Sequence, residues 1–176
     1  MSRPMKHIVG AVLFLTLGLF QATPVLARSD DLIQREIEAQ IAESMVLRDT
    51  RIEVQVEQRL VVLTGQVRLY EQKLVSDRIA WTTPGVFEVD NEIRVVPKVP
   101  LADAAIERKV REIIKTHQRF HGAGVVVAVD NGIVAIQGSF SGIGDPAFLK
   151  HQVATIEGVI DIKIHAMFLA RLYGTE

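Results

Sequence analysis

The histidines are the side chains in this 176-residue sequence best suited to metal chemistry. His117 and His121 lie four residues apart, one turn of a helix, but the string His-Gln-Arg-Phe-His lacks the glutamate of the H-E-x-x-H metalloprotease motif. The helix dipole alone also favours histidine near the end of a helix. His151 and His165 show no ligand spacing. We therefore predict no metal site.

No candidate nucleophile has a catalytic context. The chain has no cysteine, and Gly138-Ser-Phe-Ser-Gly142 has phenylalanine at the centre of what would be a G-x-S-x-G elbow. Glu53 and Glu57 alternate with apolar residues, which is typical of a solvated strand face. We therefore predict that the protein is not an enzyme and uses no cofactor.

The string Gly142-Ile-Gly144-Asp-Pro-Ala147 matches the G-x-G-x-x-A form of a dinucleotide-binding loop. The strand before it reads as half of a hairpin, whereas such loops follow a strand of a large parallel sheet. A simpler interpretation accounts for every residue, since the glycines make a turn, Asp145 caps the next helix and Pro146 occupies its first position. Nucleotide binding is not expected.

The first 27 residues have the layout of a secretory signal peptide. Arg3 and Lys6 give a positive start, residues 8–20 form an apolar run, and the segment ends Val25-Leu-Ala27. The run is shorter than the ~20 residues of a membrane-spanning helix. We predict export to the periplasm, cleavage after Ala27, and a mature chain with no transmembrane segment.

Charge excludes one class of partner. The chain carries 20 Lys and Arg against 21 Asp and Glu, a net charge of −1, and phosphate backbones are bound by clustered cations. Nucleic acid is therefore not an expected partner.

An internal repeat organises the rest. A shift of 73 residues aligns residues 30–96 with 103–169 without a gap. Each half reads helix-strand-strand-helix-strand, which predicts an α+β fold of two tandem modules, each with a three-stranded sheet packed on two helices. The expected ranges are 28–97 and 103–170, joined by the stiff Pro-containing linker 98–102 and followed by a tail, 171–176.

Apolar periodicity places the helices. Residues 33, 37, 41 and 45 form a stripe on a helix expected over 30–46, and residues 106, 110, 113 and 114 do so in the second half. Ser29 or Asp30 and Asp103 are the expected caps. Asn131-Gly132 predicts a tight hairpin, whereas Gln58-Arg59 predicts a looser one. The last strands are expected over 86–96 and 159–169.

The two halves resemble the BON domain family. Its hallmarks are a strand ending V-x-L-x-G and a later G-V. They stand here as Val61-Val-Leu63-Thr-Gly65 with Gly85-Val86, and as Val134-Ala-Ile136-Gln-Gly138 with Gly158-Val159. The resemblance, including its likeness to periplasmic proteins with two BON domains, implies a structural or phospholipid-associating role at the envelope, in support of envelope integrity or the osmotic stress response. It carries over no catalytic residue.

Aromatic and apolar residues beside cations suggest a contact surface. Trp and Tyr favour membrane headgroups, and each nearby cation adds ~1 kcal/mol of attraction to anionic lipid. The alternatives are ordinary core packing, or a surface for envelope proteins in a scaffold or chaperone-like role. The candidate surface for anionic phospholipid or a partner is Tyr70, Trp81, Ile143, Phe148, Leu149 and Lys150.

Overall fold

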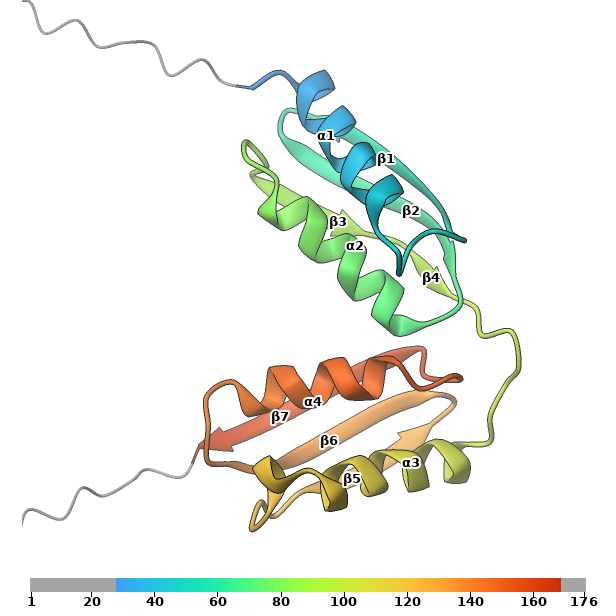
Figure 1. Cartoon of the computed structure of the whole chain (residues 1–176), viewed down its shortest axis with the longest axis vertical. Helices are drawn as coiled ribbons and strands as arrows, with labels where there is room; N and C mark the ends of the chain where they lie inside the picture. Colours follow the sequence, from blue (N-terminus) through green and yellow to red (C-terminus); the bar gives the residue numbers. More distant parts are fainter. Residues whose placement is uncertain (1–27, 169–176) are drawn as a thin grey trace, which may run out of the picture.

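The computed structural model describes residues 28–168, so the predicted signal peptide and tail lie outside the described residues. The described chain folds as two α+β modules in tandem, which confirms the predicted fold class (Figure 1). The first contains α1 (Asp30–Glu43), β1 (Arg51–Glu57), β2 (Leu60–Val67), α2 (Tyr70–Thr82), β3 (Glu88–Asn91) and β4 (Arg94–Val95). The second contains α3 (Asp103–Thr116), the 3-10 turn η1 (Gln118–Phe120), β5 (Val126–Asp130), β6 (Ile133–Phe140), α4 (Asp145–Ala154) and β7 (Asp161–Phe168).

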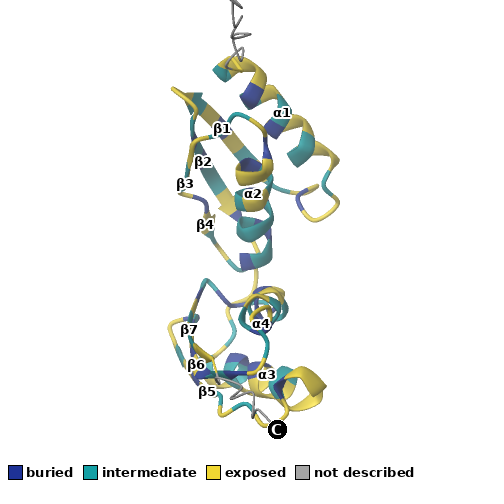
Figure 2. Cartoon of the chain, turned by 90° about the vertical axis from the view of Figure 1, so that its left-hand side faces the viewer, coloured by how far each residue is buried: buried dark blue, intermediate teal, exposed yellow. Residues whose placement is uncertain are grey.

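Both sheets have the same topology. β1 and β2 form an antiparallel hairpin, and the chain returns through α2 so that β3 and β4 lie parallel to β2. The second sheet has the order β5-β6-β7 with the same directions. In each module the two helices cover one face of the sheet (Figure 2). No helix of the described chain is long and apolar enough to cross a membrane.

The cores form where the repeat predicts. Four pairs of residues 73 positions apart are fully buried in both modules, because each helix stripe packs on alternate residues of the central strand. The fully buried matched pairs are Ile33 and Ile106, Ile37 and Val110, Val61 and Val134, and Leu63 and Ile136.

The last strand of the first module differs from the prediction of one strand over 86–96. It divides into β3 and β4, and Ile93 between them is buried. The Asn91 side-chain oxygen accepts the Ile93 N–H at 3.2 Å, and the Lys73 ammonium donates to the Ile93 carbonyl at 2.9 Å. In the second module β7 runs unbroken.

The prediction of a looser first hairpin was wrong. Gln58 and Arg59 have φ of +51° and +68°, the conformation of a two-residue hairpin turn without its usual Asn-Gly pair. The Asp30 carboxylate accepts both backbone N–H groups of this turn, at 2.8 and 3.0 Å. Asp103 does the same for the Asn131-Gly132 turn at 2.8 and 2.9 Å. These contacts offset the unfavourable backbone of the first turn.

Of the predicted helix caps, Ser29 does occupy the cap position of α1, whereas Asp30, Asp103 and Asp145 lie inside their helices. The cap positions are Ser29, Ala102 and Gly144, and none makes a side-chain capping bond. Asp30 and Asp103 instead hold the hairpins, and Asp145 accepts the Gly142 N–H at 2.8 Å to close its own loop.

Helix ends account for two further differences. α1 ends at Glu43, three residues before the predicted end, and Met45 beyond it is exposed rather than part of the stripe. α3 ends at Thr116, so His117 and His121 flank the turn η1 and do not share one helical turn. The geometry that suggested a paired histidine site is therefore absent.

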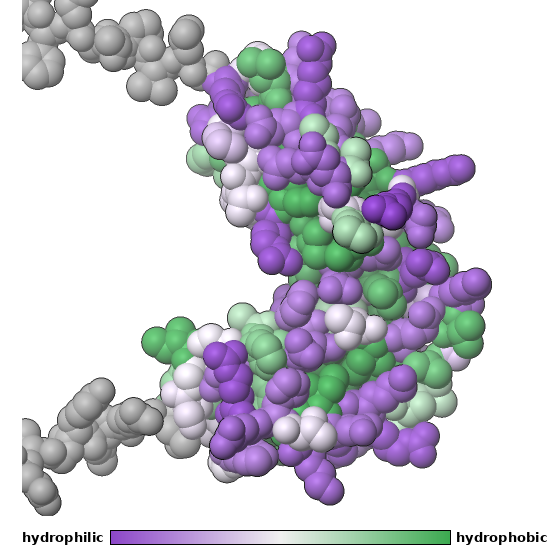
Figure 3. All heavy atoms as spheres, in the orientation of Figure 1, coloured by the Kyte–Doolittle hydropathy of each residue, from purple (hydrophilic) through white to green (hydrophobic). Residues whose placement is uncertain are grey.

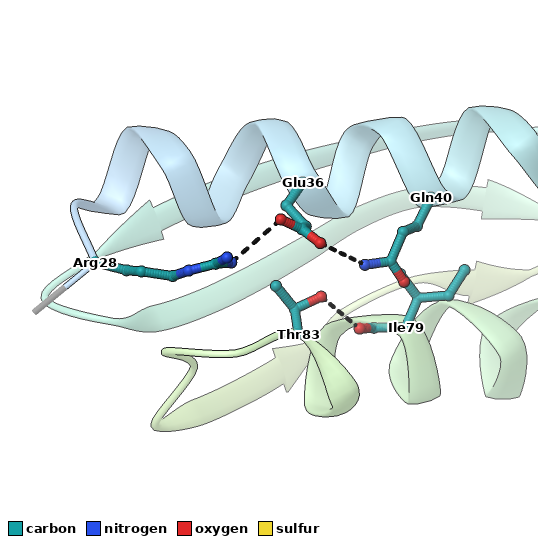
Figure 4. Close-up of polar contacts among 5 residues, drawn as sticks. All are labelled: Arg28, Glu36, Gln40, Ile79 and Thr83. Carbon is teal, nitrogen blue, oxygen red and sulfur yellow. Dashed lines mark hydrogen bonds and ion pairs between the residues drawn. The ribbon is translucent and has the colours of Figure 1, made fainter.

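The glycines before the last strands behave as predicted. Gly85 and Gly158 have φ of +100° and +92°, the left-handed conformation that ends a helix. Gly85 lies against Ile33 and Arg28 of the α1 end. There the Arg28 guanidinium pairs with Glu36 at 3.1 Å, and the Thr83 hydroxyl donates to the Ile79 carbonyl at 2.8 Å (Figure 4). The first of these contacts lies within the α1 segment and the second within the α2 segment, while Gly85 against Ile33 brings the start of α1 and the end of α2 together.

Candidate functional site

Two residues of the predicted surface are buried. Leu149 points from α4 into the second core and has no exposed area. Tyr70 begins α2 of the first module, is 7% exposed, and packs with the core of the second module. Both therefore leave the candidate surface, because neither side chain can reach a membrane in this fold. Core packing accounts for them.

Tyr70 joins the two modules. The Lys150 ammonium lies 5.8 Å from its ring centroid. Burial, followed by the neighbouring Asp161 carboxylate, raises the pKa of the Tyr70 phenol from 10.0 to about 12. The phenol is accordingly neutral at physiological pH, as its apolar surroundings require.

This shift predicts a loss of stability in alkali. The folded pKa of about 12 exceeds the ordinary value of 10.0, so the stabilisation is complete below pH 10 and disappears as the pH rises through 12. Over that interval Tyr70 should remove roughly 2–3 kcal/mol from the free energy of unfolding. Urea titrations at a series of alkaline pH values measure this, with Tyr70→Phe as the control that lacks the titrating group. Equal pH slopes in both proteins would contradict the assignment.

Polar contacts accompany Tyr70 at the junction. The His151 imidazole lies 4.0 Å from the Glu71 carboxylate, and the Glu157 carboxylate accepts the N–H groups of Lys98 and Val99 at 3.0 and 3.4 Å. The extended linker is thereby held against the second module.

A cleft opens beyond this junction, between α2 and α4 (Figure 3). Its volume is about 340 Å³, and its walls carry cations from both modules above an apolar floor. The residues lining it are Leu74, Arg78, Ala147, Lys150 and His151. Lys150 of the predicted surface therefore lies in this cleft, whereas Arg78 was missed because nothing in its own sequence context relates it to α4.

Trp81 and Ile143 are exposed, as a contact surface requires. Ile143 is 89% exposed in the loop between β6 and α4, and Trp81 is 52% exposed at the end of α2. Exposed apolar side chains mark a binding site where they form a contiguous patch with a polar rim, so the neighbours of Ile143 decide its role.

Phe148 anchors the loop that presents Ile143. It is half-buried, with its ring edge-to-face with His117 at 5.2 Å between centroids and the Arg119 guanidinium 4.8 Å above it. Arg119 also lies 3.7 Å from the Asp145 carboxylate. His117 thus has a packing role, and Arg119 adds a cation to the site that sequence reasoning missed, because it comes from the turn after α3.

Among residues 28–168 no group of three or more His, Asp or Glu side chains is placed to hold a metal ion. The string 142–147 forms the loop that Asp145 closes onto Gly142. What the geometry offers is an apolar tip, aromatic packing and cations.

Comparison with known proteins gives one family. The model of the BON domain matches residues 29–97 and 102–142. The first match spans the first module, and the second covers α3, β5 and β6 of the second. No curated protein sequence matches the chain.

Two solved structures of CdsD, a structural protein of the type III secretion system of Chlamydia trachomatis, share 14% identity with the chain. Each covers 81% of this chain at a TM-score of 0.33, and the chain covers 68% and 64% of the two CdsD chains.

Proposed function

The chain belongs to the BON domain family, and on that premise we propose that it is a periplasmic envelope protein that associates with anionic phospholipid. The BON domain is a non-catalytic binding domain. Export rests on the layout of residues 1–27, and support of envelope integrity under osmotic stress is the role that we assign from the resemblance to periplasmic proteins with two BON domains.

The observation that carries the proposal is the loop at Ile143. Its side chain is almost fully exposed, Phe148 and the cation Arg119 lie on the helix and turn behind it, and Lys150 stands further along α4 in the cleft. Burying an isoleucine side chain in the acyl boundary is worth about 2 kcal/mol, and each nearby cation adds ~1 kcal/mol at an anionic surface. Insertion of Ile143 with the cations at headgroup level therefore favours anionic over neutral lipid.

Flotation with vesicles tests this surface. The mature chain should float with phosphatidylglycerol vesicles at low salt and much less with phosphatidylcholine vesicles. Ile143→Asp should weaken binding about tenfold or more, since it removes the apolar tip and adds a repelled charge. Val126→Ser is a matched control, because Val126 is also exposed, at 64%, but lies on the open face of the second sheet. Failure of the wild-type chain to float, or equal flotation of Ile143→Asp, would overturn the proposal.

Trp81 supplies a second readout of the same experiment. It is the only tryptophan of the chain, so intrinsic fluorescence reports on this one position. We expect a blue shift on adding phosphatidylglycerol vesicles if the end of α2 also enters the headgroup region.

A protein-interaction role is the second candidate. The observation that favours it is a groove between α1 and β1 of the first module. Ile143 lies on the other module.

A further inference from the structure

The groove between α1 and β1 has a volume of about 480 Å³. Its walls are aliphatic, and charged side chains stand around its rim. The walls are Ile41, Ala42, Leu47, Ile52 and Val54, and the rim is Glu38, Arg48, Thr50, Arg51 and Glu53. A groove of this size and lining accommodates one branched aliphatic side chain with its neighbours in extended conformation.

The strand beside the groove has an open edge. β1 is the outer strand of its sheet, with β2 as its neighbour. The two-residue turn makes Glu57 and Leu60 a hydrogen-bonded pair, and pairing alternates along an antiparallel ladder. The backbone N–H and C=O groups of Ile52, Val54 and Val56 therefore point away from β2, along the edge that borders the groove.

The second module closes the same position. There the Arg111 guanidinium donates to the Val127 carbonyl at 3.1 Å and to the Glu107 carboxylate at 2.6 Å, which bridges α3 to the edge of β5. The 73-residue offset puts Glu38 where Arg111 stands and Val54 where Val127 stands. A carboxylate cannot donate to a carbonyl, so this bridge cannot form in the first module, and the edge stays available.

We propose that the first module binds an extended polypeptide segment by strand addition to β1. The segment pairs its backbone with Ile52, Val54 and Val56 and places an aliphatic side chain in the groove. This mode of recognition obtains affinity from main-chain hydrogen bonds and selectivity from the pocket beside them. It is a second binding activity, on a different surface from the phospholipid contact at Ile143.

Charge identifies the segment further. Arg48 and Arg51 stand at the start of β1, and neither forms an ion pair within residues 28–168. Glu38 lies on α1, one turn before Ala42, and lines the groove together with Val54. The segment should therefore carry an acidic residue at the arginine end and a basic residue near Glu38. Alternating donors and acceptors along the edge match a polypeptide backbone, whereas a phospholipid headgroup supplies no such ladder.

Peptide binding tests the proposal. The probes are two labelled peptides of alternating valine and threonine, one with glutamate first and lysine last and one with the reverse order, to allow either strand direction. A matched pair of peptides carries N-methyl groups on the backbone nitrogens that would donate hydrogen bonds to β1. Methylation prevents β-pairing and keeps the side chains. Fluorescence anisotropy gives the affinity, and amide exchange at Ile52, Val54 and Val56 locates it.

Glu38→Arg should copy the arginine bridge of the second module and close the edge. We expect at least one peptide order to bind the wild type, with about tenfold weaker binding to Glu38→Arg and to the N-methylated probe. Glu43→Arg is the matched control, because it makes the same charge change on the same helix outside the groove. Glu38 is exposed, so circular dichroism of Glu38→Arg should be native.

Three results would overturn strand addition: no binding of either peptide order, equal binding to Glu38→Arg, or equal binding of the N-methylated probe. Arg111→Glu should create a second binding edge on β5, and an unchanged stoichiometry would count against the role given to this bridge. Vesicle flotation of Glu38→Arg should equal that of Glu43→Arg, which makes the same charge change, so loss of peptide binding and loss of lipid binding are separable results.

Discussion

Replacing Gly65 with alanine is expected to destabilise the first module by about 4 kcal/mol. Gly65 has φ of +134°, a backbone conformation that residues with a Cβ adopt only under strain. A Cβ there would also meet the backbone carbonyl oxygen of Arg51 on the neighbouring strand, well inside van der Waals contact. Neither atom can move without displacing the β1–β2 ladder, so strain and overpacking add.

Thermal or urea unfolding measures the loss of stability. Alanine substitutions at two other glycines provide comparisons in which the strain is smaller or absent. Gly138, at the matching position of the second module, lacks the positive φ, although a Cβ would lie 3.0 Å from Val125 Cα. Gly138→Ala should therefore cost less, about 1–3 kcal/mol. Gly124 has nothing within 4 Å of its Cβ position, so Gly124→Ala should be near neutral. A smaller loss for Gly65→Ala than for Gly138→Ala would contradict the strain argument.

The periodic part of the fold could be predicted from sequence. Ile33 and Ile37 recur at helical spacing, and Val61 and Leu63 alternate along a strand, and all four are fully buried. Such patterns are local, because one element's buried face repeats with the geometry of that element. Because the sequence repeats, each pattern appears twice. The matching positions of Gly85 and Gly158 led to the correct prediction that both adopt the left-handed conformation.

Features that depend on distant partners could not be predicted. Gln58 and Arg59 form a tight turn only because Asp30, on another element, accepts their N–H groups. Tyr70 resembles an interfacial aromatic residue in its own segment, yet it is buried by the other module. The contrast between Glu38 and Arg111 was visible in the sequence, but its meaning required the Val127 carbonyl to be located beside Arg111.

The candidate site also combines, at two nearby positions, an exposure that sequence predicted correctly with one that it did not. Ile143 and Leu149 are both aliphatic and lie on the same loop and helix, and sequence reasoning placed them on one surface. Leu149 is fully buried and Ile143 is almost fully exposed. Ile143 lies in the loop before α4, which Asp145 closes onto Gly142, whereas Leu149 lies within α4 on the side that faces the core.

Leu149→Ala should destabilise the second module by about 3 kcal/mol. Truncating a fully buried leucine loses its transfer free energy and leaves a cavity among Val110, Val134 and the rest of the second core. Ile143→Ala should change the free energy of unfolding by no more than about 0.5 kcal/mol, because its side chain contacts mainly water. Urea unfolding followed by circular dichroism measures both.

The two substitutions should rank in the opposite order by their effect on vesicle binding. Below its unfolding transition, Leu149→Ala keeps the exposed Ile143 tip and should bind phosphatidylglycerol vesicles like the wild type. Ile143→Ala should weaken binding severalfold while leaving the fold intact, because only the inserted apolar area is reduced. A folded Leu149→Ala protein that no longer binds vesicles would place the lipid contact on the core-facing side of α4. Since that side packs against β7 and α3, such a result would require α4 to leave the module when it meets a membrane.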